Sequence, residues 1–311
     1  MQNWLIACVA VLLSASCLAA EAPSTGVATP EPKAQPKPTG ADGVRLWQYV
    51  QGDTPQFFDY GLKIVPPWLE GGHLLINFPE HLEYMPGTMG ILRYGDKDPK
   101  GRWIVSEDGM TAALDAPSVT APGVTVEGRA KVVSKNRIEV TMTITNGSQR
   151  ILGAIRPLYC HQYRTLAGFP QWVGNFDHTF VLRDGKLTPM SEVKTQKDSD
   201  VKAGAVKGSP EKEENPFVTE RGGLIEDGVD AAIVVITSLD GKRAMILGWT
   251  PGKNAFSNRA IPCVHADPYY GDIKPGESKM AREVILFTED DPAKSVAALV
   301  AEGVGKPGKP E

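Results

Sequence analysis

Residues 137–148 read RIEVTMTITNGS. Apolar side chains occupy every second position from Ile138 to Ile144, and polar side chains fill the positions between them. Because successive side chains of a β-strand point to opposite faces, this alternation predicts a strand with one buried face. Asn146-Gly147 at the end of the stretch favours a tight turn. The stretch therefore predicts an antiparallel sheet that packs on one side against a core.

Segments of the same character flank this strand. Residues 124–133, VTVEGRAKVV, are predicted to pair with it across a turn at Lys135-Asn136. Further strands and hairpins are predicted at 180–189, 231–249 and 272–287. The unbroken apolar runs of the second of these segments indicate central strands that are covered on both faces. Short strands separated by turns predict an all-β fold, an antiparallel β-sandwich.

One short C-terminal helix completes the predicted fold. Asp291 is expected to cap it and Pro292 to occupy its first position, with an apolar stripe that ends before Gly303. The mixed-charge segment 191–215 has no periodicity and is expected to be a solvated loop. The stretch 71–96 is expected to be a long ordered loop between strands.

The chain is predicted to have four parts. Residues 1–20 carry no charged side chain and hold a short apolar run, which is typical of a cleaved signal peptide. Residues 21–43 are rich in Pro, Ala and Thr and predict a disordered spacer. A single sandwich domain is expected over 44–303, followed by a flexible tail at 304–311. No later segment is apolar enough to predict a transmembrane span.

An export signal predicts a periplasmic or extracellular protein. Cys17 leaves an alternative open, in which a lipid anchor on this residue tethers the protein to a membrane. In an oxidising compartment, Cys160 and Cys263 are expected to form a disulfide, with two buried free thiols as the alternative. The net charge of −4 is too small to predict a nucleic-acid partner.

Four motifs resemble the galactose mutarotase-like (aldose 1-epimerase-like) superfamily. HQYRTLAG at 161–168 is similar to that family's H-S-Y-F-N-L-A-G, and FDHTFVL at 176–182 is similar to its Y-D-H-N-F-V-L. The strand at 272–287 resembles the family's L-K-P-G-E strand, and EVTMTITNGSQRIL at 139–152 resembles a strand with a T-x-T-N turn. The resemblance implies a supersandwich of two antiparallel sheets with a concave, sugar-sized groove.

The same resemblance implies proton transfer on a sugar. His161 and His178 match the family's two histidines, and Asp267 or His265 stands near the position where the family has its carboxylate base. An acid and a base on opposite sides of one pyranose would open and reclose the sugar ring. The Asp at this place is shorter than the family's Glu, and the two histidines are closer in sequence than in the family.

Strand geometry suggests how the two histidines could still meet. If 151–163 and 177–183 are antiparallel neighbours, both histidines lie near the same sheet end. A histidine on an apolar face is also a common core residue, so a structural role is weighed beside the catalytic one. Contacts to a sugar are expected from Arg156, Gln162, Tyr163 and Tyr269.

The stretch CVHADPYYGD at 263–272 is the best local candidate for a ligand site. Its histidine, aspartates and tyrosines are suited to holding a sugar by stacking and hydrogen bonds. The alternative is a polar turn that closes two strands, because Asp before Pro is a common turn former.

Metal binding has a weaker basis in the sequence. His265 and Asp267, two residues apart, are the one pair that we find with a ligand-like spacing, and we assign no metal and no cofactor. The candidate ligands are His161, Asp177, His178, His265 and Asp267, with Cys160 and Cys263. The sequence contains no G-x-S-x-G and no Gly-rich phosphate loop before a helix. Serine hydrolase and nucleotide-binding functions are therefore unsupported.

The predicted function is that of an exported protein that acts on or binds a mono- or oligosaccharide. Within it, proton transfer by His161 and His178 with Asp267 as base is the first hypothesis. A polysaccharide lyase is the second, with Tyr269, His265 and Arg259 serving a uronate substrate. A non-catalytic carbohydrate-recognition or cell-surface structural protein is the third.

Overall fold

The computed structural model describes residues 43–48, 61–68, 72–85, 87–89, 102–118, 121–171, 175–210, 216–259 and 261–308. Side chains are described for these residues except 78–85, 87–89, 154, 156, 175, 216 and 217. The predicted signal peptide, the spacer up to residue 42 and Cys17 lie outside the described residues. All described residues belong to one compact unit, Pro32–Glu311.

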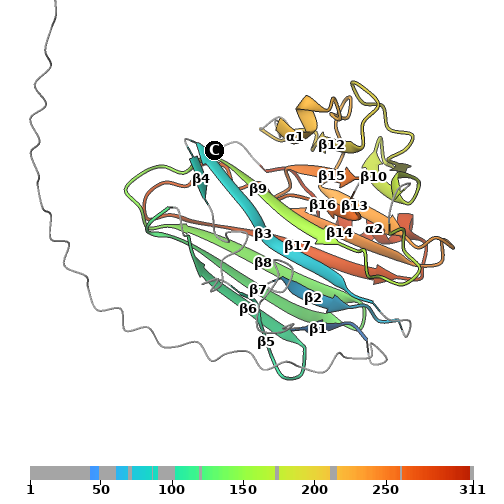
Figure 1. Ribbon diagram of the computed structural model, residues 1–311, viewed down its shortest axis with the longest axis horizontal. Helices are drawn as coiled ribbons and strands as arrows, with labels where there is room; N and C mark the ends of the chain where they lie inside the picture. Colours follow the sequence, from blue (N-terminus) through green and yellow to red (C-terminus); the bar gives the residue numbers. More distant parts are fainter. Residues whose placement is uncertain are drawn as a thin grey trace, which may run out of the picture. The chain divides into compact units, whose positions relative to one another are not determined.

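Eight strands form the first sheet, which is antiparallel throughout. Its order is β1-β2-β3-β9-β16-β15-β12, and β4 pairs with β3. The long strands β3 and β9 lie side by side (Figure 1). The strands are β1 Arg45–Trp47, β2 Leu62–Val65, β3 Leu74–Met85, β4 Gly87–Met89, β9 Gly153–Gln162, β12 Val201–Ala205, β15 Asn254–Asn258 and β16 Cys263–His265.

Nine strands form the second sheet, also antiparallel, in the order β11-β10-β13-β14-β17-β8-β7-β6-β5. The strand that opened the sequence analysis is β8, between β7 and β17 (Figure 1). The strands are β5 Ile104–Val105, β6 Thr111–Pro117, β7 Val124–Ser134, β8 Arg137–Asn146, β10 Thr179–Arg183, β11 Lys186–Pro189, β13 Ile233–Thr237, β14 Ala244–Thr250 and β17 Ser278–Thr288.

The main core lies between the two sheets. Ile155 and Tyr159 of β9 belong to the same buried cluster as Ile285 and Phe287 of β17. Alternate residues of both sheets contribute to it, as the period of two in the sequence requires. The predicted antiparallel β-sandwich is therefore confirmed.

A second, smaller core covers the other face of the nine-stranded sheet. Helix α2, Pro292–Ala301, packs Val296 and Leu299 against Ile233 and Ile246 of β13 and β14. These two strands thus have apolar residues buried on both faces, which confirms what their unbroken apolar runs predict. The short C-terminal helix is also confirmed. Among the described residues, no helix has the length and apolar character to cross a membrane.

The predicted hairpins are present. Strands β7 and β8 pair across Lys135-Asn136, and β13 pairs with β14 across the turn that contains Gly241. Strands β10 and β11 join through Asp184 and Gly185, whose φ values are 49° and 73°. Both values lie in the left-handed region, as a type I′ turn with an Asp-Gly sequence requires.

Two expectations about the strands are wrong: one concerns a strand pairing, and the other concerns a segment expected to be a loop. The segments that carry His161 and His178 are not neighbours, because β9 pairs with β3 and β16 whereas β10 pairs with β11 and β13 of the other sheet. The stretch 71–96 is not simply a loop, since it contains the twelve-residue strand β3. Interruption of its alternation by a bulge between Asn77 and His81 hides this strand from a pattern search.

The expected loops also hold more structure than their composition predicts. Strand β12 lies within 191–215 and pairs with β15, although its sequence VKAGA has no alternation and little β-propensity. A five-residue helix, α1 Pro216–Glu220, follows. In the expected flexible tail, Gly305 accepts a backbone hydrogen bond from Ala232 and Lys306 accepts one from Gly252. These features depend on pairing with distant segments.

We expect Asp291→Ala to lower the free energy of unfolding by about 1 kcal/mol, because the Asp291 side chain accepts a hydrogen bond from the backbone N–H of Ala293 at 2.9 Å. Urea denaturation measures the change. Asp290→Ala removes a neighbouring carboxylate that does not cap the helix and serves as the matched control. Equal losses in the two variants would contradict a capping role.

Candidate functional site

Strand β9 presents two different chemistries on its two faces. Tyr159 and His161 point into the core between the sheets, whereas Cys160 and Gln162, at the alternate positions, point to the outer face of the eight-stranded sheet. The residues matched to one family motif, HQYR, are therefore divided between two separate environments.

His161 forms a pair with Glu283 inside the core. Its Nε2 atom lies 2.6 Å from Oε1 of Glu283 on β17, and neither side chain has any exposed surface. Burial raises the pKa of Glu283, while the neighbouring His161 acts in the opposite direction. The pair joins the two sheets of the sandwich and has no contact with solvent. It is suited to fixing how the sheets pack, not to exchanging protons with a ligand.

His178 lies in a different place, immediately before β10 in the nine-stranded sheet. Its Nδ1 atom is 3.2 Å from the hydroxyl of Thr237, and its carbonyl accepts the backbone N–H of Thr237 at 2.9 Å. The side chain is half-buried. These bonds tie the start of β10 to the end of β13.

Asp267 and His265 lie on the outer face of the eight-stranded sheet. The carboxylate of Asp267 accepts the backbone N–H of Tyr159 at 2.8 Å, and Nδ1 of the His265 ring lies 3.8 Å from it, beyond hydrogen-bond distance. Both side chains are almost fully buried. Burial lowers the pKa of His265 well below its ordinary value, so the ring is neutral at physiological pH. The structure therefore does not bring His161, His178 and Asp267 together around one cavity.

The expected substrate contacts are likewise dispersed. Tyr163 is fully buried in the main core. Arg259 is half-buried and lies over the Phe176 ring, with its guanidinium carbon 5.7 Å from the ring centroid. Tyr269 is half-buried at the loop after β16. The side chain of Arg156 lies outside the described part.

A tyrosine pair that the sequence analysis did not single out has a structural role. The hydroxyls of Tyr159 and Tyr270 are 3.0 Å apart, and Tyr270 donates to the carbonyl of Met142 across the core at 3.1 Å. Burial raises the pKa of both phenols. Both groups therefore stay protonated and act as hydrogen-bonding links between the sheets.

The two cysteines are buried free thiols, so the expected disulfide is not formed in the structure. Cys263 pairs with Gln162 in the ladder between β16 and β9, and Val264 pairs with His161. Cys160 is therefore diagonal to Cys263, and diagonal Cα atoms of antiparallel strands are about 7–8 Å apart. A disulfide prefers Cα atoms roughly 4.4–6.8 Å apart.

A polar cluster lies on the outer face of the eight-stranded sheet, and the sequence did not predict it as a unit. Its members are Asn77, Cys160, Gln162, Cys263 and His265. It spans three adjacent strands, since Asn77 of β3 pairs with Cys160 of β9 and Cys263 of β16 pairs with Gln162. Asn77 and Gln162 are 1% and 6% exposed. Within the described part of the chain, Nδ2 of Asn77 and Oε1 of Gln162 have no hydrogen-bond partner. Buried amides of this kind are rare in proteins unless they serve a ligand or an ordered water.

The sequence held one signal for this cluster. Residues two apart on a strand share a face. Cys160 and Gln162 could therefore have been placed on one face of their strand, and Cys263 and His265 on one face of theirs. That both pairs share the same face, and that Asn77 joins them, depends on which strands pair.

A groove of about 620 Å³ runs over the outer face of the other sheet. Strands β5 to β8 line it, with Arg129, Lys131 and Glu139 as its charged residues. Arg129 donates to the Asp115 carboxylate at 2.8 Å and to two backbone carbonyls. Its hydrogen-bonding capacity is largely used within the protein, so this groove is the weaker candidate.

Comparisons with known proteins find similarity only among solved structures. No family model and no curated protein sequence matches the chain. A galactose mutarotase-like protein from Lactobacillus casei is 12% identical, with a TM-score of 0.37 over 76% of this chain and 96% of that chain. A galactose mutarotase-like protein from Clostridium acetobutylicum is 9% identical, with a TM-score of 0.33 over 74% of this chain and 93% of that chain. A polysaccharide lyase is 11% identical, with a TM-score of 0.35 over 83% of this chain and 34% of its own.

These similar structures include proteins of the superfamily that the motifs resemble. The similarity is distant, and no function of this chain follows from it.

We expect Glu283→Gln to remove a pH dependence from the stability of the fold. The raised pKa means that folded Glu283 keeps its proton at a pH where the unfolded chain has lost it. Its stabilising contribution is complete below the ordinary value of 4.5 and is lost as the pH rises through the raised pKa. Relative to the variant, the wild type should therefore lose free energy of unfolding as the pH rises.

Urea denaturation over a pH series measures this difference. Glu192→Gln changes an exposed glutamate and is the matched control. A wild-type-to-variant difference that stays constant with pH would show that Glu283 does not titrate differently in the folded state.

Proposed function

We propose that the protein is an exported carbohydrate-binding protein, and that the sugar contacts the polar cluster on the outer face of the eight-stranded sheet. The single observation that carries the proposal is the pair of buried amide atoms, Asn77 Nδ2 and Gln162 Oε1, without partners in the described part of the chain. A buried polar group without a partner costs about 1–3 kcal/mol, which a ligand that completes its hydrogen bonds recovers.

The chemistry of the two atoms fits a sugar hydroxyl. An amide NH₂ donates and an amide oxygen accepts, while a hydroxyl both accepts and donates. Asn77 and Gln162 lie on adjacent strands, diagonal to one another in the ladder, so their amides are neighbours on one face of the sheet. A polyol would reach both amides once the side chains that cover them move aside. Both atoms are shielded from water. Hydrogen bonds are electrostatically stronger in such a buried environment than in water.

The placement of the expected catalytic groups favours binding over proton transfer. His161 is enclosed with Glu283, His178 is bonded to Thr237 in the other sheet, and Asp267 accepts the backbone N–H of Tyr159. An acid and a base must flank the same reacting atoms. The non-catalytic member of the three functional hypotheses is therefore the one that we adopt.

An experiment can distinguish the lyase hypothesis from carbohydrate binding without catalysis. Its proposed base, His265, is almost fully buried. Incubation of the protein with uronate polymers and measurement of unsaturated product absorbance tests it. A rise in absorbance that Tyr269→Phe removes would replace the binding proposal with a lyase.

We expect Asn77→Leu and Gln162→Met to weaken sugar binding about tenfold each, which corresponds to loss of a hydrogen bond worth roughly 1.4 kcal/mol. A glycan array of neutral and uronate-containing oligosaccharides selects the probe, and calorimetric titration measures its affinity. Urea denaturation verifies that each variant remains folded, because the substitutions also remove the second polar atom of each amide.

Asn146→Leu is the matched control for this experiment. The Asn146 amide donates to the carbonyls of Arg150 and Ile273 at 2.7 and 2.8 Å. Its loss should lower the free energy of unfolding by about 2 kcal/mol or more. Absence of binding to every glycan, or binding that neither cluster substitution weakens, would refute the proposal.

Export is the second part of the proposal, and the uncharged apolar segment at 1–20 supports it. We expect the mature protein isolated from its cells to begin close to Glu21. Mass spectrometry of its N-terminal peptide distinguishes a cleaved signal peptide from a chain that is acylated at Cys17. Recovery of a peptide that begins at Met1 would contradict export by either route.

A further inference from the structure

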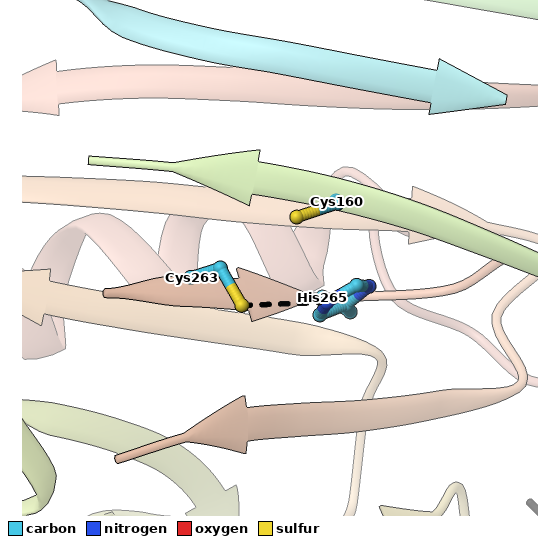
Figure 2. Close-up of side chains that lie close together, drawn as sticks. All are labelled: Cys160, Cys263 and His265. Atoms are coloured by element: carbon cyan, nitrogen blue, oxygen red, sulfur yellow. Dashed lines mark hydrogen bonds between the residues drawn. The ribbon is translucent and has the colours of Figure 1, made fainter. Parts of the chain in front are cut away.

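Cys160, Cys263 and His265 form a compact group of soft ligands on the outer face of the eight-stranded sheet. The two Sγ atoms and one ring nitrogen all lie within 4.8 Å of one another, and the three side chains are buried. Figure 2 shows the Cys263 side chain directed toward His265, with Sγ and Nε2 3.8 Å apart. They come from two strands that are far apart in sequence, β9 and β16.

The sheet fixes this arrangement. Cys263 and His265 lie two residues apart on β16 and so share a face. Continuing the ladder between Cys263 and Gln162 by two residues places Cys160 directly opposite His265. The three ligand atoms are therefore held by backbone pairing in the middle of a sheet, where little chain entropy is lost when they bind an ion.

We propose that Cys160, Cys263 and His265 bind a zinc ion. Two thiolates and one neutral imidazole are a common protein ligand set for this metal, and three protein ligands leave the fourth tetrahedral position for water or another small ligand. This site does not depend on the proposed carbohydrate binding, because Asn77 and Gln162 are not among its ligands.

The distances suit the ion. Zn–S bonds of about 2.3 Å and Zn–N bonds of about 2.0 Å place tetrahedral ligand atoms roughly 3.3–3.8 Å apart. The separation between Cys263 Sγ and His265 Nε2 is already 3.8 Å. The largest separation in the group is within 4.8 Å, so rotation of side chains by a small amount closes the site.

Charge selects a divalent ion over a monovalent one. Two thiolates, a neutral imidazole and the nearby Asp267 carboxylate leave one buried negative charge around Zn²⁺ and two around Cu⁺. Burial of an uncompensated charge is costly, and the surrounding Phe256 ring, 4.7 Å from the His265 ring, offers no counter-charge.

Asp267 could serve as an outer-shell partner if the His265 ring moved closer, because the two groups are near one another but not hydrogen-bonded. Its Oδ1 atom is 3.8 Å from Nδ1 of His265, on the side of the ring that faces away from Cys263. The backbone N–H of Tyr159 holds this carboxylate in position. A carboxylate behind a metal-bound histidine orients the ring and fixes which nitrogen carries the proton.

Titration of the reduced, full-length mature protein with Zn²⁺ and with Co²⁺ tests the site. We expect one ion per chain, a sulfur-to-cobalt charge-transfer absorption, and a zinc affinity that rises with pH because two thiols release protons. Zinc should also raise the unfolding temperature. Cys160→Ser, Cys263→Ser and His265→Gln should each weaken zinc binding at least a hundredfold.

His178→Gln is the matched control, since it changes a half-buried histidine of the other sheet and should leave zinc affinity unchanged. Circular dichroism verifies that each variant is folded, and two folded variants of the three suffice for the comparison. Absence of stoichiometric zinc in the reduced wild type, a cobalt spectrum without the sulfur band, or affinity unchanged in the folded ligand variants would overturn the proposal.

Discussion

Neighbouring residues of a β-strand have to face opposite sides of its sheet, and this constraint organises the molecule at β9. Tyr159 and His161 enter the core between the sheets, while Cys160 and Gln162 face outward. The inward residues connect to the second sheet through Glu283 and Tyr270, so the core is joined by polar links as well as apolar contacts. The outward residues meet β3 and β16 and form the polar cluster.

The polar groups of the two faces have different energetic roles. In the core, His161 lies against Glu283, and the phenol of Tyr159 bonds to that of Tyr270, which donates to Met142. Such links add specificity to the packing of two sheets, because only one relative position satisfies them. On the outer face, the buried amides of Asn77 and Gln162 lie beside Cys160, Cys263 and His265.

The expectation that the strands of His161 and His178 are neighbours does not hold in the structure. HQYR and FDH are close in sequence and resemble parts of one family site, yet their strands belong to different sheets. A short sequence match gives the residue types of a motif, but it does not show which strands pair and so where those residues lie. The residues that geometry brings together, Asn77, Cys160, Gln162, Cys263 and His265, come from three segments that the match did not connect.

The sequence by itself determined the local elements: the alternation of β8, the hairpins at Asp184-Gly185 and Gly241, the doubly covered β13 and β14, and the cap of α2 at Asp291. These signals act over a few residues, through side-chain periodicity, turn dihedral angles and end capping. Only the tertiary structure decided that β9 pairs with β3 and β16, that VKAGA becomes an edge strand, and that His161 is enclosed beside Glu283. Strand pairing depends on contacts between segments about a hundred residues apart, and no local pattern encodes which partner buries which face.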